Sequence, residues 1–140
     1  MKEEIKNIKE KAANAAKNAL KASEKYVSLF HPDIFGRQRR SYTSEEDFFR
    51  MAGELKVCSE IFFECSEEYL FLEEKLETVA EYQNLHKNAI LLSEINDLCV
   101  EPFLKDIYRE ALKDTVDVGK IKRSAETFSV KLKNYMTRIF

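Results

Sequence analysis

The sequence predicts an all-α protein, an elongated antiparallel helical bundle or coiled coil of about three long helices. Only three glycines and two prolines occur in 140 residues, which leaves little room for the turns of a sheet. Apolar residues recur at alternating spacings of three and four, the period of a helix that packs along one seam. Apolar residues make up 44% and charged residues 34% of the chain, a globular but heavily charged composition.

The first helix is predicted over residues 2–30. Its seam consists of Ile5, Ile8, Ala12, Ala15, Ala19, Ala22, Tyr26 and Leu29. The alanines permit a close approach of another helix. Pro32 ends the helix because proline disfavours helical backbone in the residue before it. Residues 31–43 are therefore predicted to form a loop, which carries Gly36 and several arginines.

The second helix is predicted over residues 44–101, a stretch with no proline and a single glycine, Gly53. One helix of this length would measure about 87 Å, whereas a compact globule of this size spans only about 35–40 Å. We therefore predict a rod. The alternative is a turn between residues 70 and 90 that no Gly, Pro or Asn-Gly marks. The seam changes phase after Val79, which we interpret as a local change of supercoil.

Consecutive large apolar residues around Phe62 and Tyr69 point to several sides of this helix and need cover from more than one neighbour. Three helices of one chain would not cover them along a rod, so the sequence predicts a homodimer. The predicted dimer interface consists of Phe62, Phe63, Tyr69, Leu70, Leu72 and Leu76.

The carboxy-terminal part is predicted as helices over 102–115 and 119–140, with a weak joint at Thr115–Gly119. Pro102 follows a helical pattern without a good N-cap before it, which predicts a kink and not a clean break. All helices belong to one domain, residues 1–140.

No catalytic or metal-binding constellation is present, so neither an enzyme nor a cofactor is predicted. His31 and His86 lack a helical partner at the spacing that metal sites need and are interpreted as structural. Cys58, Cys65 and Cys99 are interpreted as core thiols of a reducing compartment. No run of eighteen apolar residues spans a membrane, and the amino terminus lacks a signal-peptide core, which predicts a cytoplasmic protein, peripheral at most to a membrane.

Charge is segregated along the chain. Residues 1–43 carry ten basic and five acidic groups, residues 44–101 four and fifteen, and residues 102–140 nine and five. Basic segments either solubilise the protein or contact an anionic surface. The candidate lipid-binding residues are Arg37, Arg39, Arg40, Lys120, Lys122, Arg123, Lys131 and Lys133. Nucleic acid is not an expected partner, because the net charge is −2 and no RNA-binding pattern appears.

Residues 85–95 and 100–107 resemble the second helix of BAR domains. The matching positions are His86, Ile90, Ile95, Pro102, Phe103, Asp106 and Ile107. Residues 41–49 resemble the start of that helix in BAR domains of Arf GTPase-activating proteins. As a shortened or diverged member, the chain would be a homodimeric helical bundle whose basic residues contact curved membrane.

Two functions follow as predictions. The leading one is a non-catalytic, BAR-like dimer that binds or senses curved anionic membranes in trafficking. The alternative is a helical adaptor or scaffold domain that binds a protein partner through an apolar helical face.

Overall fold

The computed structural model describes the backbone of residues 2–39, 42–74 and 79–140, and the side chains of these residues except 42–44 and 79–82. This part of the chain is almost entirely helical, which confirms the all-α prediction. In chain order the elements are α1 (Lys2–Ser28), β1 (Arg37–Arg39), α2 (Tyr42–Glu73), α3 (Val79–Ile95), a π-helical turn (Asn96–Val100), α4 (Glu101–Ala111), β2 (Thr115–Asp117) and α5 (Val118–Ile139).

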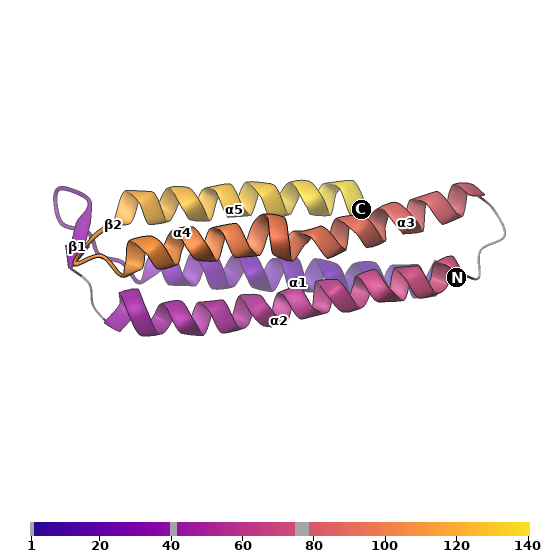
Figure 1. The fold of residues 1–140 in the computed structure, drawn as a ribbon, viewed down its shortest axis with the longest axis horizontal. Helices are drawn as coiled ribbons and strands as arrows, with labels where there is room; N and C mark the ends of the chain where they lie inside the picture. Colours follow the sequence, from indigo (N-terminus) through magenta and orange to yellow (C-terminus); the bar gives the residue numbers. More distant parts are fainter. Residues whose placement is uncertain (1, 40–41, 75–78) are drawn as a thin grey trace.

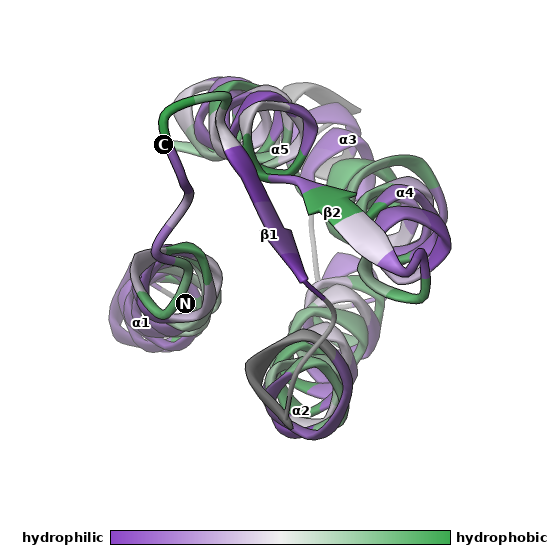
Figure 2. Cartoon of the chain, turned by 90° about the vertical axis from the view of Figure 1, so that its left-hand side faces the viewer, coloured by the Kyte–Doolittle hydropathy of each residue, from purple (hydrophilic) through white to green (hydrophobic). Residues whose placement is uncertain are grey.

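The helices form an antiparallel bundle of four columns, and neighbouring columns run in opposite directions (Figure 1). The third column is composite: α3 continues through the π-helical turn into α4. Contacts join α1 to α2, α2 to α3, α4 to α5, and α5 back to α1. Seen along the bundle, the columns surround a common centre, and both strands lie across one end (Figure 2). Short connections between antiparallel helices are typical of such bundles.

The prediction of one helix over 44–101 is wrong. Helix α2 ends at Glu73, and α3 begins at Val79 and runs back alongside α2 (Figure 1). The alternative, a reversal between residues 70 and 90, is the one observed. Folding back allows the seams of both halves to enter one core, so that Leu72 and Leu85 are only 5% and 4% exposed. The chain thereby covers by itself apolar surface that a rod would expose to water.

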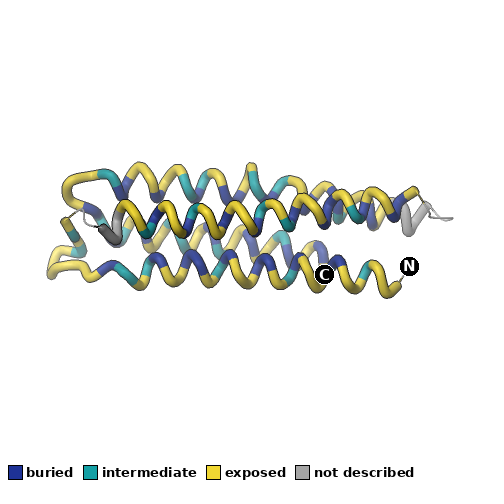
Figure 3. The backbone as a smooth tube through the Cα atoms, turned by 90° about the horizontal axis from the view of Figure 1, so that it is seen from below, coloured by how far each residue is buried: buried dark blue, intermediate teal, exposed yellow. Residues whose placement is uncertain are grey.

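The core runs along the inner faces of all four columns (Figure 3). On α1 it is lined mainly by alanines, as the seam predicts, and Ala12 and Ala19 are fully buried. Larger side chains on the facing helices fill the space that these small residues leave, and among them are the fully buried Phe62, Tyr69 and Phe128. Interiors packed in this way lose stability when a buried side chain is shortened.

The helix continues through Pro102, and the predicted absence of a clean break there is confirmed. Proline has no N–H to donate and would disturb the regular hydrogen-bond ladder. The π-helical turn lies directly before it, and the N–H of Glu101 donates to the carbonyl of Asn96. This wider turn absorbs the disturbance, so that α3 and α4 form one column.

The two short strands were not predicted. Strand β1 lies within the expected loop 31–43, and β2 lies at the expected joint between the last two helices. They pair antiparallel, with Arg37 opposite Asp117 and Arg39 opposite Thr115. The backbone N–H of Val118 also donates to Gly36 O at 3.0 Å. The strand pair therefore fastens the loop after α1 to the beginning of α5.

Candidate functional site

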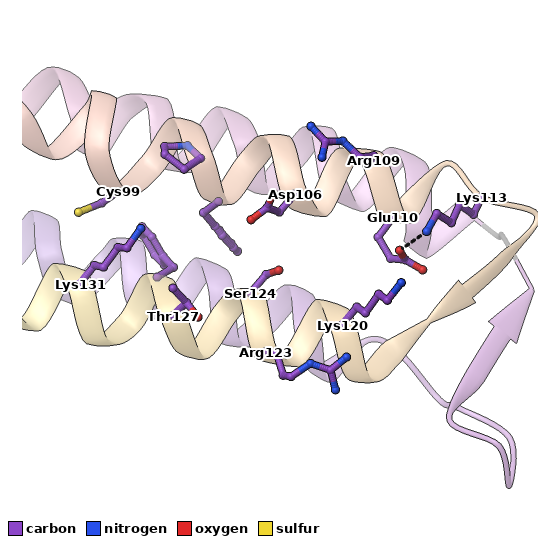
Figure 4. A pocket seen from close by; sticks show the side chains of 13 residues that line it. Cys99, Asp106, Arg109, Glu110, Lys113, Lys120, Arg123, Ser124, Thr127 and Lys131 are labelled. Atoms are coloured by element: carbon purple, nitrogen blue, oxygen red, sulfur yellow. Dashed lines mark hydrogen bonds and ion pairs between the residues drawn. The ribbon is translucent and has the colours of Figure 1, made fainter.

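A groove between α4 and α5 opens beside the strand pair (Figure 4). Its volume is about 370 Å³. Five basic and two acidic side chains line it together with hydroxyl and apolar groups. They are Cys99, Pro102, Phe103, Asp106, Arg109, Glu110, Lys113, Lys120, Arg123, Ser124, Thr127, Phe128 and Lys131. The excess of basic groups makes this groove the part of the described surface best suited to a small anion.

An aromatic pair lies between the two helices at the groove. Phe103 of α4 and Phe128 of α5 stack with ring centroids 4.6 Å apart and an angle of 16° between the rings. Both are buried in the core, at 3% and 1% exposure. Because this contact fixes the distance between α4 and α5, it also fixes the width of the groove above it.

Glu110 holds the strand-pair end of the groove together. Its carboxylate accepts a hydrogen bond from Lys113 Nζ at 2.7 Å and one from the backbone N–H of Asp117 at 2.8 Å. Burial alone would raise the pKa of Glu110, but the Lys113 ammonium and the Asp117 N–H outweigh burial and lower the pKa. Glu110 is therefore a charged structural group whose acceptor capacity is engaged within the protein.

The remaining polar side chains of the groove are arranged differently. Asp106 of α4 and Ser124 of α5 face one another across the opening, and Lys120 extends from α5 toward Glu110 (Figure 4). Lys131 extends across at the far end, toward α4. Within the described residues none of Lys120, Arg123 and Lys131 takes part in an ion pair. These cations are available to a ligand, although the Lys120 charge also helps to lower the pKa of Glu110.

A tight turn at the same end of the bundle displays two large apolar side chains. Asp33 Oδ1 accepts the backbone N–H groups of Phe35 and Arg37 at 2.9 and 3.0 Å, and Gly36 adopts a φ of 76°. The N–H of Asp33 donates to Arg37 O at 2.8 Å. Ile34 and Phe35 lie at the tip of this turn and are 93% and 78% exposed. We call residues 33–37 the apolar tip.

The structure places several predicted lipid-binding residues at this end or along the groove that begins there. Arg37 and Arg39 are exposed on β1, while Lys120, Arg123 and Lys131 line the α4–α5 groove. Lys122 belongs to a different groove, between α1 and α5, and Lys133 lines neither. Arg40 lies outside the described residues.

The predicted dimer interface is wrong for three of its residues. Phe62, Tyr69 and Leu72 are 1%, 0% and 5% exposed in the core of a single chain, so they cannot contact a second one. Phe63 and Leu70 are exposed, at 56% and 43%. Leu76 lies outside the described residues. A homodimer stays a prediction, which only the two exposed side chains now support.

A second, larger groove of about 880 Å³ lies between α2 and the composite column. Phe63, Val100 and Leu104 contribute apolar surface to it. Its charged side chains are mostly acidic: Lys56, Glu60, Glu64, Asp97 and Glu101. An apolar groove with acidic sides differs in chemistry from the basic groove between α4 and α5.

His86 joins two helices, and the three cysteines lie in the core. His86 Nδ1 lies 2.9 Å from Glu73 Oε1 in a contact between α3 and α2, which agrees with a structural histidine. All three cysteines are buried and free, as predicted. Burial raises the pKa of both Cys65 and Cys99 to about 11, which keeps these thiols protonated and unreactive. No cluster of potential metal ligands occurs in the described part of the chain.

Sequence reasoning missed two parts of this site. Asp106, Arg109 and Lys113 look like an ordinary solvated helix face until α5 is placed beside α4. Ile34 and Phe35 do carry a local signal in the sequence, because two large apolar residues lie between the turn residues Pro32-Asp33 and Gly36, just before an arginine run.

No family model, curated protein or solved structure matches the chain. Among the described helices, none is both long and apolar enough to cross a bilayer.

Proposed function

We propose that the protein is a non-catalytic binding module that attaches to an anionic membrane surface by the end that carries the strand pair. The observation that carries this proposal is the apolar tip. Ile34 and Phe35 are 93% and 78% exposed, yet the turn that displays them is held by the hydrogen bonds that the N–H groups of Phe35 and Arg37 donate to Asp33 Oδ1. A preformed turn that holds two large apolar side chains in water suits insertion into the boundary between headgroups and acyl chains.

The charges around the apolar tip support an anionic target. Arg37 and Arg39 follow the tip directly, and Lys120 lies near the start of α5, which the strand pair fastens to the tip. Each basic residue close to an anionic bilayer contributes about 1 kcal/mol. Several acidic groups at this end are engaged within the protein, because Asp33, Glu110 and Asp117 all accept hydrogen bonds from backbone N–H groups. Apolar insertion and basic attraction together provide the two signals that stable attachment requires.

This mode of attachment differs from the one that the BAR resemblance implies. The folded-back α2 and α3 do not offer a single long helix along which two chains would form an arch. Attachment through the apolar tip needs neither a second chain nor a curved membrane. A relationship to BAR domains stays a prediction, while membrane binding is proposed here on separate grounds.

Co-sedimentation with vesicles tests the proposal. We expect binding to vesicles of phosphatidylcholine with phosphatidylserine, weakened by salt, and little binding to phosphatidylcholine alone. The double variant I34S/F35S should bind at least 100-fold more weakly, because burial of each side chain contributes about 1.5–3 kcal/mol.

The matched control is L98S/V130S, which removes two apolar side chains that are 50% and 59% exposed on the helices away from the tip. It should bind like the unchanged protein. Equal losses in both double variants, or no salt-sensitive binding at all, would contradict the proposal.

The alternative function, a helical adaptor, is favoured by the groove between α2 and the composite column. Phe63 lies partly exposed in an apolar depression whose sides carry Glu60 and Glu101. This chemistry suits an amphipathic helix with a basic polar face. A synthetic leucine–lysine helix should bind, and F63S should abolish its binding without affecting attachment to vesicles. Binding of that helix unchanged in F63S would exclude this groove.

A further inference from the structure

We propose that the groove between α4 and α5 binds a phosphorylated polyol, either as the inositol phosphate headgroup of a lipid or as a free inositol phosphate. The lipid form of this inference rests on the proposed membrane function, and the free form does not. The groove, its cations and its hydroxyl groups all belong to the described residues.

The charges of the groove favour phosphate groups. Its two acidic residues are not equivalent, because Glu110 is committed to Lys113 and to the backbone of Asp117. Only Asp106 faces the opening. Lys120 and Lys131 enter from α5, near the two ends of the groove (Figure 4). Two ammonium groups separated along a groove suit a ligand with two separate phosphates better than one with a single anionic centre.

Asp106 and the uncharged groups of the groove favour a polyol. Asp106 repels bare phosphate, but its carboxylate accepts hydrogen bonds from ring hydroxyls. Ser124 faces it from α5, and Thr127 lies one turn further along the same helix. Pro102, which lies above the buried Phe103–Phe128 pair, supplies apolar surface for a ring's C–H groups. Hydroxyls and phosphates on one ring match this combination, whereas inorganic polyphosphate satisfies only the cations.

The size of the groove agrees with such a ligand. A volume of about 370 Å³ lies near the lower end of the range for small-molecule sites, about 300–1,000 Å³. A groove of this volume is large enough for one substituted six-membered ring.

Calorimetric titration of the full chain with a soluble inositol trisphosphate is the first test. The variant K120A/K131A should bind at least tenfold more weakly than the unchanged protein. The matched control K122A/K133A removes the same charge from the same helix outside this groove and should bind within twofold of the unchanged protein. All four lysines are exposed, and thermal melting of each variant verifies the fold.

Asp106 provides a test of the polyol. The unchanged protein should prefer inositol trisphosphate to tripolyphosphate, and D106N should reduce this preference by binding tripolyphosphate more tightly. Equal affinity of the unchanged protein for both anions would overturn the assignment to a polyol, because the cations alone would then account for binding.

Vesicles distinguish the two sources of the ligand. The groove binds a lipid headgroup if the protein binds vesicles with phosphatidylinositol bisphosphate more strongly than phosphatidylserine vesicles of equal charge, and if K120A/K131A loses this preference. Binding of the soluble trisphosphate without vesicle binding assigns it to a free ligand, and the membrane function then fails alone. The groove proposal is overturned if the soluble trisphosphate does not bind, or if both lysine variants lose the same affinity. Vesicle binding that depends on Ile34 and Phe35 would still support the membrane function in that case.

Discussion

The adjacent residues Phe62 and Phe63 provide a direct test of the folded-back bundle. Phe62 is 1% exposed in the core of one chain, and Phe63 is 56% exposed on its surface. Replacing each in turn by alanine removes the same atoms from neighbouring positions of the same helix. Any effect on helix propensity is therefore matched, and only burial differs.

The expected losses follow from these exposures. Phe62→Ala leaves a cavity that the surrounding core fills only in part, so the free energy of unfolding should fall by about 3–5 kcal/mol. Phe63→Ala leaves no closed cavity and removes less than half of a buried ring, so the loss should be about 1 kcal/mol. With a urea dependence of about 2 kcal/mol per molar for a domain of this size, Phe62→Ala lowers the unfolding midpoint by about 2 M.

Urea unfolding followed by circular dichroism at two protein concentrations is the assay. In the folded-back bundle Phe62 stabilises a single chain, so the midpoint of Phe62→Ala should not depend on protein concentration. In a two-chain rod the same ring would lie between chains, and the midpoint would rise with concentration. A concentration-dependent midpoint, or a loss for Phe62→Ala no larger than for Phe63→Ala, would refute the placement of Phe62 in the core of one chain.

Two further predictions concern backbone conformation and pH. Gly36→Ala should lower the free energy of unfolding by about 1–2 kcal/mol, because φ at Gly36 is 76°. Gly53→Ala in α2 should raise the free energy of unfolding by about 0.5–1 kcal/mol, because alanine favours a helix and an added Cβ meets nothing within 4 Å there. Urea unfolding measures both changes. The pKa of Glu110 is lowered in the folded state, so its charge stabilises the fold above the ordinary pKa of 4.5 and this contribution is lost as the pH falls through the lowered value. Thermal melting between pH 7 and 3 should therefore show Glu110→Gln less stable than the unchanged protein near neutrality and more nearly equal to it in acid. The control is Glu126→Gln at an exposed position. A constant difference in stability between Glu110→Gln and the unchanged protein across this range would contradict the role of the charge.

The reversal between α2 and α3 illustrates what helical periodicity can and cannot predict. The seam continues at spacings of three and four on both sides of residues 75–78, so its local pattern is the same for one rod and for a helical hairpin. Only long-range burial decides between them, and Leu72 and Leu85 are buried on antiparallel helices. The phase change after Val79 was the local sign of the new helix, which we interpreted as a change of supercoil.

The residues behind the BAR resemblance have a physical explanation in the bundle. Ile95, Phe103 and Ile107 are at most 3% exposed, so their spacing follows from burial along the composite column. Pro102 is accommodated by the π-helical turn before it. These three buried positions therefore report the inner face of a long helix, whereas Ile90 of the same set is 44% exposed. The resemblance drew attention to apolar spacing, while Arg109 and Lys113 on the same helix, which line the groove, carried no pattern of their own.

The segregation of charge in the sequence becomes a segregation in space, and this constrains how the protein would approach a membrane. Helices α1 and α5, from the two basic segments, are neighbours, and so are α2 and α3, from the acidic segment. The first turns of α2 carry the exposed Glu45 and Glu46 at the same end of the bundle as the apolar tip (Figure 1). An upright bundle would therefore bring acidic groups toward anionic lipid together with Arg37 and Lys120. A tilt that lowers α5 and raises α2 removes this repulsion while the apolar tip stays inserted, and it brings the groove between α4 and α5 closer to the headgroups.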